Sequence, residues 1–279
     1  MPELPEVETI KEAIRQTISG AIIESVEVYN HRLRQEIPQD LEKIAYKTHI
    51  ANIYRRAKYI VIDLDNGYSL ILHLGMSGRI KILSAQPLNL EKHDHVVIKT
   101  TKGVIIYNDA RRFGLLTYCL TNKLEQNPLF TDLGFDPFDD KATGEYLFKT
   151  FKNKKTYIKL ALLDQHILAG IGNIYASEAL YEAKISPLRV CSTLTLKECS
   201  CLLEAVRLIL KKAIAAGGST LRDYKKPDGS LGYFQNQHCV YDKEGKRCPN
   251  CTCNLKKTGG IKKVVLGGRS SFYCDYLQK

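Results

Sequence analysis

The first twenty residues carry apolar side chains at helical spacing. These positions recur every three or four residues, at Val7, Ile10, Ile14 and Ile18. Pro5 suits the first turn of a helix, and Gly20 is a common residue just past a helix end. The pattern predicts that the chain opens with an amphipathic helix, which would pack against an edge of the structure that follows.

Residues 21 to about 118 show a shorter period. Eight runs are short and rich in β-branched residues and tyrosine, as is typical of strands: 21–28, 49–56, 59–64, 68–74, 79–83, 95–100, 103–107 and 115–118. Turn sequences such as Asp65-Asn66-Gly67 separate them. Because the hairpins follow one another without intervening helices, we predict an antiparallel β-sandwich.

The second half of the chain has a helical pattern. Helices are predicted at 144–151, 156–164, 173–183 and 196–216, and strand-like pieces follow from about 238. Residues 121–143 contain Asn127-Pro128 and Asp136-Pro137 and are the predicted linker. The predicted fold class is therefore α+β. A β-sandwich domain with a leading helix occupies 1–120, a helical domain 144–236 and a small β-ribbon 237–279.

The charge is concentrated near the end of the chain. The sequence has 41 Lys and Arg against 30 Asp and Glu, a net charge of +11. Residues 211–279 hold 14 basic and five acidic residues and contribute +9 of this charge. A basic terminal quarter favours a polyanionic partner, most simply nucleic acid, although a generally basic surface would give the same count.

The nine cysteines are not arranged as a disulfide framework. Their number is odd, and most lie singly within apolar or helical segments. We therefore expect reduced thiols and a cytoplasmic protein. No secretory signal and no membrane-spanning segment are predicted. One cluster has a spacing that suggests a metal site: Cys248, Cys251, Cys253 and Cys274.

The segment Met1-Pro2-Glu3-Leu4-Pro5-Glu6 has the most distinctive chemistry. Because methionine is normally removed before a small residue, we expect Pro2 to carry the free amine. An α-amino group has a pKa of about 7.7–8.0, so a sizeable fraction is neutral and nucleophilic near pH 7. Glu3, if shielded from water, could act as an acid or base. Taken alone, the two prolines are explained more simply as residues that stiffen a helix start.

The chain resembles the bacterial formamidopyrimidine-DNA glycosylases from its first residues to its last. The opening nine residues are joined by further motifs in the family's order: Lys58 within 55–59, and residues 73–78, 92–95, 109–114, 170–178, 217–223, 232–234 and 269–274. So many motifs in register do not arise by chance. The resemblance implies a bifunctional glycosylase and abasic-site lyase of base excision repair. Its implied substrates are oxidised purines such as 8-oxoguanine and formamidopyrimidines in duplex DNA.

The resemblance also implies roles for three catalytic residues. Pro2 would attack the sugar C1′ while the damaged base leaves, giving a Schiff base that undergoes β- and then δ-elimination. Glu3 would move protons to and from the sugar, and Lys58 would contact a phosphate near the lesion and assist catalysis. No cofactor is needed for this chemistry.

A base inside a duplex must be extruded before a buried amine can reach its sugar. The residues that match the family's void-filling positions are Met76, Arg111 and Phe113. Met76 and Phe113 would supply apolar wedges, and Arg111 would donate hydrogen bonds to the unpaired cytosine. Periodicity does not choose between Arg111 and its neighbour Arg112 as the inserted residue.

Further residues match family positions on the DNA-binding surface. Residues 169–174 interrupt a helical pattern with two glycines, which predicts a turn that delivers backbone N–H groups at a helix start. The resemblance implies a helix–two-turns–helix motif here, with Asn173 on a phosphate. It also places His73 and Lys155 near the lesion, and Arg269 of the ribbon's hairpin on the adjacent phosphate.

The loop from about 219 to 233 is rich in glycine, aspartate and lysine. In the family this loop closes over the everted base. The side chains expected to contribute here are Ser219, Arg222 and Tyr224. A basic loop that is ordered only on DNA is the plainer interpretation.

The family usually ends in a four-cysteine zinc ribbon, and this chain departs from it. Cys248 and Cys251 form the first pair and Cys274 begins the second, but Leu277 stands where the fourth ligand belongs. Leucine cannot bind a metal, and structural zinc sites are almost always closed tetrahedra. Three outcomes stay open: Zn²⁺ on three cysteines with water or another ligand, recruitment of Cys253, or a ribbon that folds without metal.

Two rival functions are weighed against this interpretation. Oxidised-pyrimidine glycosylases of the endonuclease VIII type usually begin Pro-Glu-Gly-Pro-Glu, whereas Leu4 stands at the distinguishing position here, and Arg111-Arg112-Phe113 also favours the purine branch. A damaged-DNA-binding paralogue without catalysis would not need the three catalytic residues, all of which are present. The expected partner is damaged double-stranded DNA, bound by a monomer.

Overall fold

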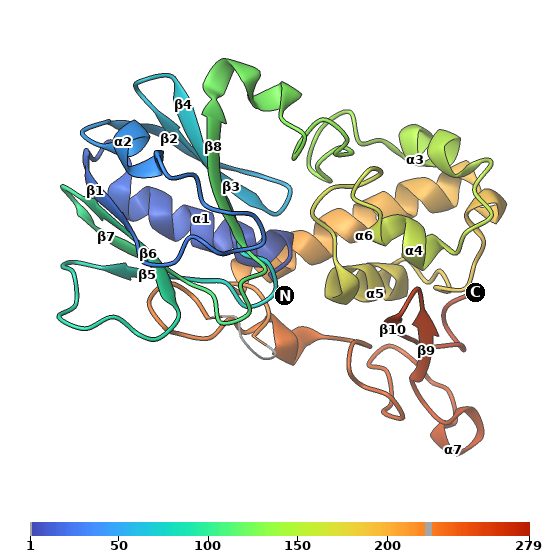
Figure 1. Ribbon diagram of the computed structural model, residues 1–279. Coiled ribbons are helices and arrows are strands. Elements are labelled where there is room, and N and C mark those ends of the chain that lie inside the picture. Colours follow the sequence, from blue (N-terminus) through green and yellow to red (C-terminus); the bar gives the residue numbers. More distant parts are fainter. Residues whose placement is uncertain (1, 221–224) are drawn as a thin grey trace. The chain divides into compact units, whose positions relative to one another are not determined.

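The structure is a computed structural model that describes residues 2–220 and 225–279 (Figure 1). Contacts divide the chain into two compact units, which are considered one at a time. Unit 1 contains the residues up to Asp132 together with 214–235, and unit 2 contains 133–213 and 236–279. Two of the residues expected to contact the lesion, Arg222 and Tyr224, lie outside the described residues.

Unit 1 contains two four-stranded sheets. The first has the order β2-β3-β4-β8, with bounds Ile50–Arg56, Tyr59–Leu64, Tyr68–His73 and Leu115–Leu120. The second has the order β1-β6-β7-β5, with bounds Ile23–Val28, Asp94–Thr100, Gly103–Asn108 and Arg79–Leu83. All strand pairs in both sheets are antiparallel, which confirms the predicted sandwich.

The first helix, α1 (Leu4–Ile18), supplies part of the core of unit 1. Its apolar stripe is buried among residues of both sheets, at Val7, Ile10, Ile14 and Ile18. The helix contacts β2, the edge strand of one sheet, and β5, the edge strand of the other. Burial of each aliphatic side chain contributes about 1.5–3 kcal/mol. The stripe therefore fixes where the first turn of α1 lies.

Unit 2 contains the predicted helices. Their bounds are Gly144–Phe151 for α3, Ile158–Leu163 for α4, Asn173–Glu182 for α5 and Leu196–Ala215 for α6, of which the last two residues belong to unit 1. Arg207 of α6 donates hydrogen bonds to the backbone carbonyls of Pro137, Asp139 and Ala142 at 2.6–3.1 Å. One guanidinium thus fastens the segment before α3 to the longest helix.

The ribbon of unit 2 is an antiparallel hairpin of β9 (Lys262–Leu266) and β10 (Arg269–Tyr273). Gly267 and Gly268 form its turn with φ of 53° and 74°, a left-handed conformation that glycine adopts without steric cost. The strand-like pieces predicted beyond residue 238 are therefore present, and they begin later than the pattern indicated.

A buried carboxylate joins this ribbon region to α5. Glu178, 1% exposed, accepts the backbone N–H groups of Cys239, Val240 and Tyr241 at 2.7–3.0 Å. Burial raises the pKa of Glu178, and the three hydrogen bonds oppose that rise. The segment that leads into the ribbon is thus held by a helix far away in sequence.

Several short elements were not predicted. These are α2 (Leu41–Ala45), the 3₁₀ turns η1 (Thr121–Gln126), η2 (Cys191–Thr193) and η3 (Phe234–Gln237), and α7 (Leu255–Thr258). Each is too short to show a periodic apolar face. In residues 2–220 and 225–279, no helix combines the length and the apolar character that crossing a bilayer requires.

Candidate functional site

The first described residues lie buried at the start of α1. Pro2 is buried, and Glu3, the N-cap residue of the helix, is 2% exposed. The backbone N–H of Glu3 donates to Oε2 of Glu6 at 2.8 Å. Glu6 is itself buried, so a carboxylate one turn into the helix fixes the backbone that carries both predicted catalytic residues.

The second oxygen of Glu6 holds Ser219, near the start of the predicted loop. Its Oε1 accepts the backbone N–H of Ser219 at 2.7 Å. The base of the loop is closed by a backbone hydrogen bond from Phe234 to the carbonyl of Gly218 at 3.0 Å. The structure therefore brings the predicted residue Ser219 to the N-terminal pair, and Glu6 is the link. Sequence reasoning missed Glu6, although a glutamate three residues after an N-cap is a visible signal.

Lys58 lies in the two-residue turn between β2 and β3. The first turn residue, Ala57, has φ of 52°, a left-handed conformation that costs a non-glycine residue about 1–2 kcal/mol. Tyr59 follows the turn and pairs with His73 at the end of β4, with ring centroids 4.8 Å apart. Lys58 and His73 therefore occupy the same end of one sheet.

The imidazole of His73 is neutral near pH 7. Burial, with a smaller contribution from the nearby cations Lys58 and Arg34, lowers its pKa to about 4. Its Nδ1 accepts the backbone N–H of Gly75 at 3.1 Å, so the proton resides on Nε2. His73 can thus donate a hydrogen bond without carrying a charge.

Two neighbouring loops, 74–78 and 109–114, are joined by one buried carboxylate. Asp109 is fully buried and accepts the hydroxyl of Ser77 at 2.6 Å and the backbone N–H of Gly114 at 2.8 Å. These bonds connect the loop after β4 with the loop after β7. The two loops therefore form one platform.

The platform presents the predicted wedge residues together. A Cβ on Gly75 would lie 2.4 Å from the carbonyl carbon of Phe113, so the two backbones touch and leave no room for a side chain. Met76 and Phe113 are 37% and 46% exposed, large values for apolar side chains. The guanidinium of Arg111 stacks 4.8 Å from the centre of the Phe113 ring. Its neighbour Arg112 is exposed and has φ of 56°.

In unit 2, Gln165 locks the glycine turn between α4 and α5. Its side chain accepts the backbone N–H of Gly170 and donates to the carbonyl of Ile171, both at 2.9 Å. Asn173 is the first residue of α5. The turn therefore fixes the backbone at the N-terminus of α5, where the positive end of the helix dipole suits a phosphate.

Lys159 is a buried cation at this helix start that sequence reasoning missed. It is 0% exposed, and its ammonium donates to the carbonyl of Asn173 at 2.9 Å and to the hydroxyl of Ser177. The predicted residue Lys155 is instead exposed, before α4 begins. The available signal was a single lysine inside the apolar run 158–162.

The β9–β10 hairpin lies against Asn173. The Asn173 Nδ2 donates to the carbonyl of Ser270 at 2.8 Å, next to the exposed side chain of Arg269. Among the described residues, two buried side-chain atoms have no hydrogen-bond partner, Asn173 Oδ1 and Ser271 Oγ. Because buried polar groups nearly always have partners, this spot is suited to a polar ligand.

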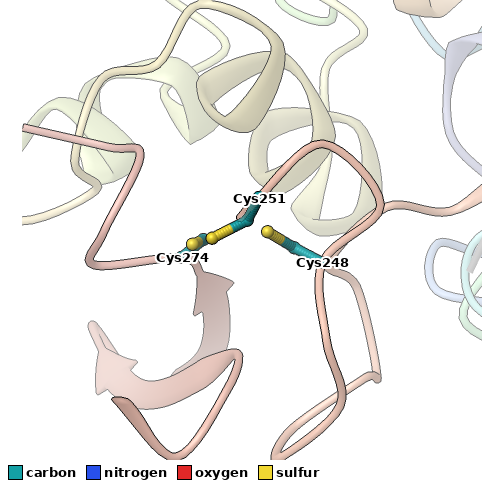
Figure 2. Close-up of side chains that lie close together, drawn as sticks. All are labelled: Cys248, Cys251 and Cys274. Atoms are coloured by element: carbon teal, nitrogen blue, oxygen red, sulfur yellow. The ribbon is translucent and has the colours of Figure 1, made fainter. Parts of the chain in front are cut away.

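Three of the ribbon's cysteines converge. The sulfurs of Cys248, Cys251 and Cys274 all lie within 4.8 Å of one another, and all three residues are buried (Figure 2). Zinc–sulfur bonds are about 2.3 Å long, so thiolates this close can share one ion after small adjustments. Cys253 is not a member of this group among the described residues. Its sulfur accepts a hydrogen bond from the Thr258 hydroxyl at 3.4 Å.

An apolar residue occupies the sequence position of the fourth ligand. Leu277 packs against the hydrophobic cluster that contains Cys248, Cys251 and Cys274. The next residue, Gln278, is 2% exposed and accepts the backbone N–H of Cys274 at 2.8 Å while donating to the carbonyl of Ile185 at 2.9 Å. Hydrogen bonds within the protein therefore fix the turn that a fourth cysteine would otherwise tie to a metal.

Comparisons with known proteins give one consistent result. The family described as the formamidopyrimidine-DNA glycosylase N-terminal domain matches residues 1–116, and the one described as its H2TH domain matches 133–225. The formamidopyrimidine-DNA glycosylase of Dinoroseobacter shibae is 42% identical over the full length of both chains. That of Rickettsia massiliae is 43% identical, over all of this chain and 97% of its own.

Solved structures agree. A Lactococcus lactis formamidopyrimidine-DNA glycosylase variant bound to Fapy-dG-containing DNA is 32% identical, with a TM-score of 0.90 over the full length of both chains. The Lactococcus lactis protein bound to abasic-site DNA has a TM-score of 0.88 at 31% identity, over 99% of both chains.

The position of Glu6 yields a testable expectation. In a Glu6→Gln variant the amide nitrogen cannot accept, so one buried backbone N–H loses its partner, at a cost of about 1–3 kcal/mol in unfolding free energy. Hydrogen exchange at Ser219 and Glu3 should speed up, as mass spectrometry can measure. The matched control is Glu12→Gln, which alters a partly exposed carboxylate on the same helix that, among the described residues, is hydrogen-bonded to neither Glu3 nor Ser219. If both variants exchange and unfold alike, Glu6 does not hold the loop.

The lowered pKa of His73 predicts how the unfolding free energy depends on pH. Between about pH 6.5 and 4 the unfolded chain binds a proton at this residue and the folded chain does not, so the unfolding free energy should fall as the pH falls through this range. Burial depresses the pKa of His238 similarly, to about 4. Denaturant melts of a His73→Asn variant should therefore show a weaker, but not abolished, pH dependence. An imidazole NMR titration midpoint near 6.5 for His73 would refute the assignment.

Proposed function

Because the chain belongs to the formamidopyrimidine-DNA glycosylase family, we propose that it removes oxidised purines such as 8-oxoguanine and formamidopyrimidines from duplex DNA in base excision repair. The observation that carries the proposal is the buried carboxylate of Glu6, which holds both the Pro2–Glu3 backbone and the loop at Ser219. A nucleophile and a base-covering loop would then share one anchor. All nine cysteines are unpaired, which is in keeping with action in the cytoplasm.

The proposed chemistry uses the amine of Pro2 after removal of Met1. The neutral nitrogen attacks the sugar C1′, the C1′–N bond of the damaged base breaks, and the base departs with that electron pair and a proton. The ring opens to an iminium, which acts as an electron sink and allows β- and then δ-elimination of the two phosphates. Glu3, shielded at 2% exposure, is the group placed to move protons on the sugar.

Lys58 and the neutral His73 are proposed to hold the backbone phosphates near the lesion. They share one end of the sheet, and Lys58 is close enough to depress the pKa of His73. A lysine supplies charge, whereas a neutral imidazole supplies a directed hydrogen bond.

The two-loop platform is proposed to fill the space left by the extruded nucleotide. Met76 and Phe113 provide the exposed apolar surface. Arg111 is proposed as the inserted arginine in preference to Arg112, because it already stacks on Phe113. Its guanidinium would then donate to the unpaired cytosine.

In unit 2 we propose that Asn173 and Arg269 bind one DNA phosphate. The helix start, the Asn173–Ser270 contact and the two unpartnered polar atoms support this assignment. Lys159, buried behind Asn173, positions the helix start. For Lys155, which is exposed, the proposed role is a contact with the DNA backbone.

Zinc fits three of the four coordination positions in the ribbon and not the fourth. We propose that Zn²⁺, when bound, is held by Cys248, Cys251 and Cys274 with an exchangeable fourth ligand, and that the ribbon fold does not depend on it. The hydrogen bonds of Gln278 and the packing of Leu277 support this view. The metal would add rigidity and takes no part in the reaction.

A trapping experiment tests the enzymatic proposal. With borohydride present, the protein should form a covalent adduct with a duplex containing 8-oxoguanine opposite cytosine, because reduction fixes the Pro2 iminium. An N-terminally extended chain, in which the Pro2 nitrogen is an amide, should bind the duplex without forming an adduct. A wild-type protein that binds but is never trapped would instead be a damaged-DNA-binding paralogue.

A comparison of cutting rates on two damaged duplexes distinguishes an oxidised-purine glycosylase from one of the endonuclease VIII type. A duplex containing thymine glycol should be cut more slowly than one containing 8-oxoguanine. Leu4 and the stacked Arg111–Phe113 pair favour the purine branch. Faster cutting of thymine glycol would assign the protein to the endonuclease VIII type.

Measurement of the zinc content tests whether the ribbon binds zinc weakly and folds without it. After dialysis against a chelator, the wild type should hold substoichiometric zinc and keep its circular dichroism spectrum. A Leu277→Cys variant, which completes the tetrahedron, should retain one chelator-resistant zinc per chain. The proposal fails if the wild type keeps a full complement of zinc under the same treatment, or if the chelator unfolds the ribbon.

A further inference from the structure

Arg55 links two catalytic elements of unit 1. It lies on β2, one residue before the strand ends, and its side chain is only 9% exposed. The Nε donates to Oε2 of Glu8 in α1 at 2.7 Å, and Nη1 donates to the backbone carbonyl of Ala57 at 3.0 Å. One guanidinium is therefore hydrogen-bonded both to the first helix and to the turn that carries Lys58.

The carbonyl that Arg55 holds belongs to a strained residue. Ala57 is 3% exposed and adopts φ of 52°, which side-chain-bearing residues rarely do. Such a conformation persists only where surrounding contacts enforce it. The hydrogen bond from Arg55 is such a contact, and Lys58 is the next residue along the chain.

Glu8, which accepts the hydrogen bond from Arg55, is itself held in a fixed position. It also pairs with Lys11 at 2.6 Å, and its carboxylate lies one and a half turns along the helix from Glu3. Burial raises the pKa of Glu8, but hydrogen bonds from Lys11 and Arg55 lower it overall, so it stays ionised at neutral pH. The stripe of apolar residues on α1 holds the helix in the core.

We propose that Arg55 is a positioning residue that fixes Lys58 relative to Pro2 and Glu3 by bridging Glu8 and the Ala57 carbonyl. The inference rests on the proposed function, since it concerns the placement of Lys58 in that reaction. Arg55 itself touches no reacting atom. A misplacement of about 1 Å in a catalytic group lowers a rate by about a hundredfold, so a rigid bridge has a measurable effect.

The adjacent Arg56 is a natural control. It also lies on β2, but it pairs with Glu125, which is 69% exposed, and it contacts the Phe130 ring. An Arg56→Met variant removes the same charge from the same strand. It leaves the bridge from Glu8 to Ala57 intact.

The experiment is a double-mutant cycle with Lys58, measured as the single-turnover rate of adduct formation by the full-length protein on the 8-oxoguanine duplex. Arg55→Met should slow the reaction about ten- to a hundredfold. Arg55→Lys should recover little of this loss, because an ammonium keeps the charge but not the planar two-point grip. Arg56→Met should stay within about twofold of wild type. DNA affinity measured by mobility shift should change little in any of them.

The decisive comparison uses the Lys58→Ala background. There Arg55→Met should change the remaining rate by no more than about twofold, because its effect passes through Lys58. If the loss is as large without Lys58 as with it, or if Arg55→Met keeps the wild-type rate, the inference is wrong. Should Arg55→Met fail to fold, Glu8→Ala frees the guanidinium while preserving helix propensity, and must show the same dependence on Lys58. A wild type that is never trapped would instead refute the proposed function.

Discussion

Buried carboxylates that accept backbone N–H groups organise the segments that form the candidate site and the segment before the ribbon. Glu6 holds Glu3 and Ser219, Asp109 holds Gly114 together with the Ser77 hydroxyl, and Glu178 holds three successive amides before the ribbon. Loop amides have no strand or helix partner, and leaving them buried and unpaired costs about 1–3 kcal/mol each. A carboxylate has two acceptor oxygens and can therefore pair with several backbone N–H groups at once.

These carboxylates explain how side chains on loops can be held in fixed positions. In unit 1 the sandwich core fixes α1 and the strand ends, and Glu6 and Asp109 extend that rigidity into the loops that follow. In unit 2, Lys159 has the complementary role, since a buried ammonium holds a helix-start carbonyl. These buried groups are tolerated because each has hydrogen-bond partners of the opposite polarity.

The fold could be predicted well from the sequence because core packing requires apolar residues at the period of each helix or strand. The strands Tyr59–Leu64 and Arg79–Leu83 and the helix Gly144–Phe151 have the predicted bounds. Short elements such as Leu41–Ala45 leave no such trace. The N-terminal motif of the candidate site was visible from its residues, yet its supports were not, since the Ser219 amide that Glu6 holds is 213 residues away in sequence. Lys159 was missed because one lysine within an apolar run does not show that its side chain faces inward.

The stacked pair of Arg111 and Phe113 has a consequence for how DNA is searched. The guanidinium rests on the ring, above a platform that Asp109 keeps fixed. Its conformational entropy is thus lost during folding and not at each encounter with a base pair. In the proposed role of this pair as a wedge, a side chain held in place beforehand would test every base pair by its resistance to unstacking. Damaged pairs would then be sorted by how readily they unstack, before any group on the base itself is recognised.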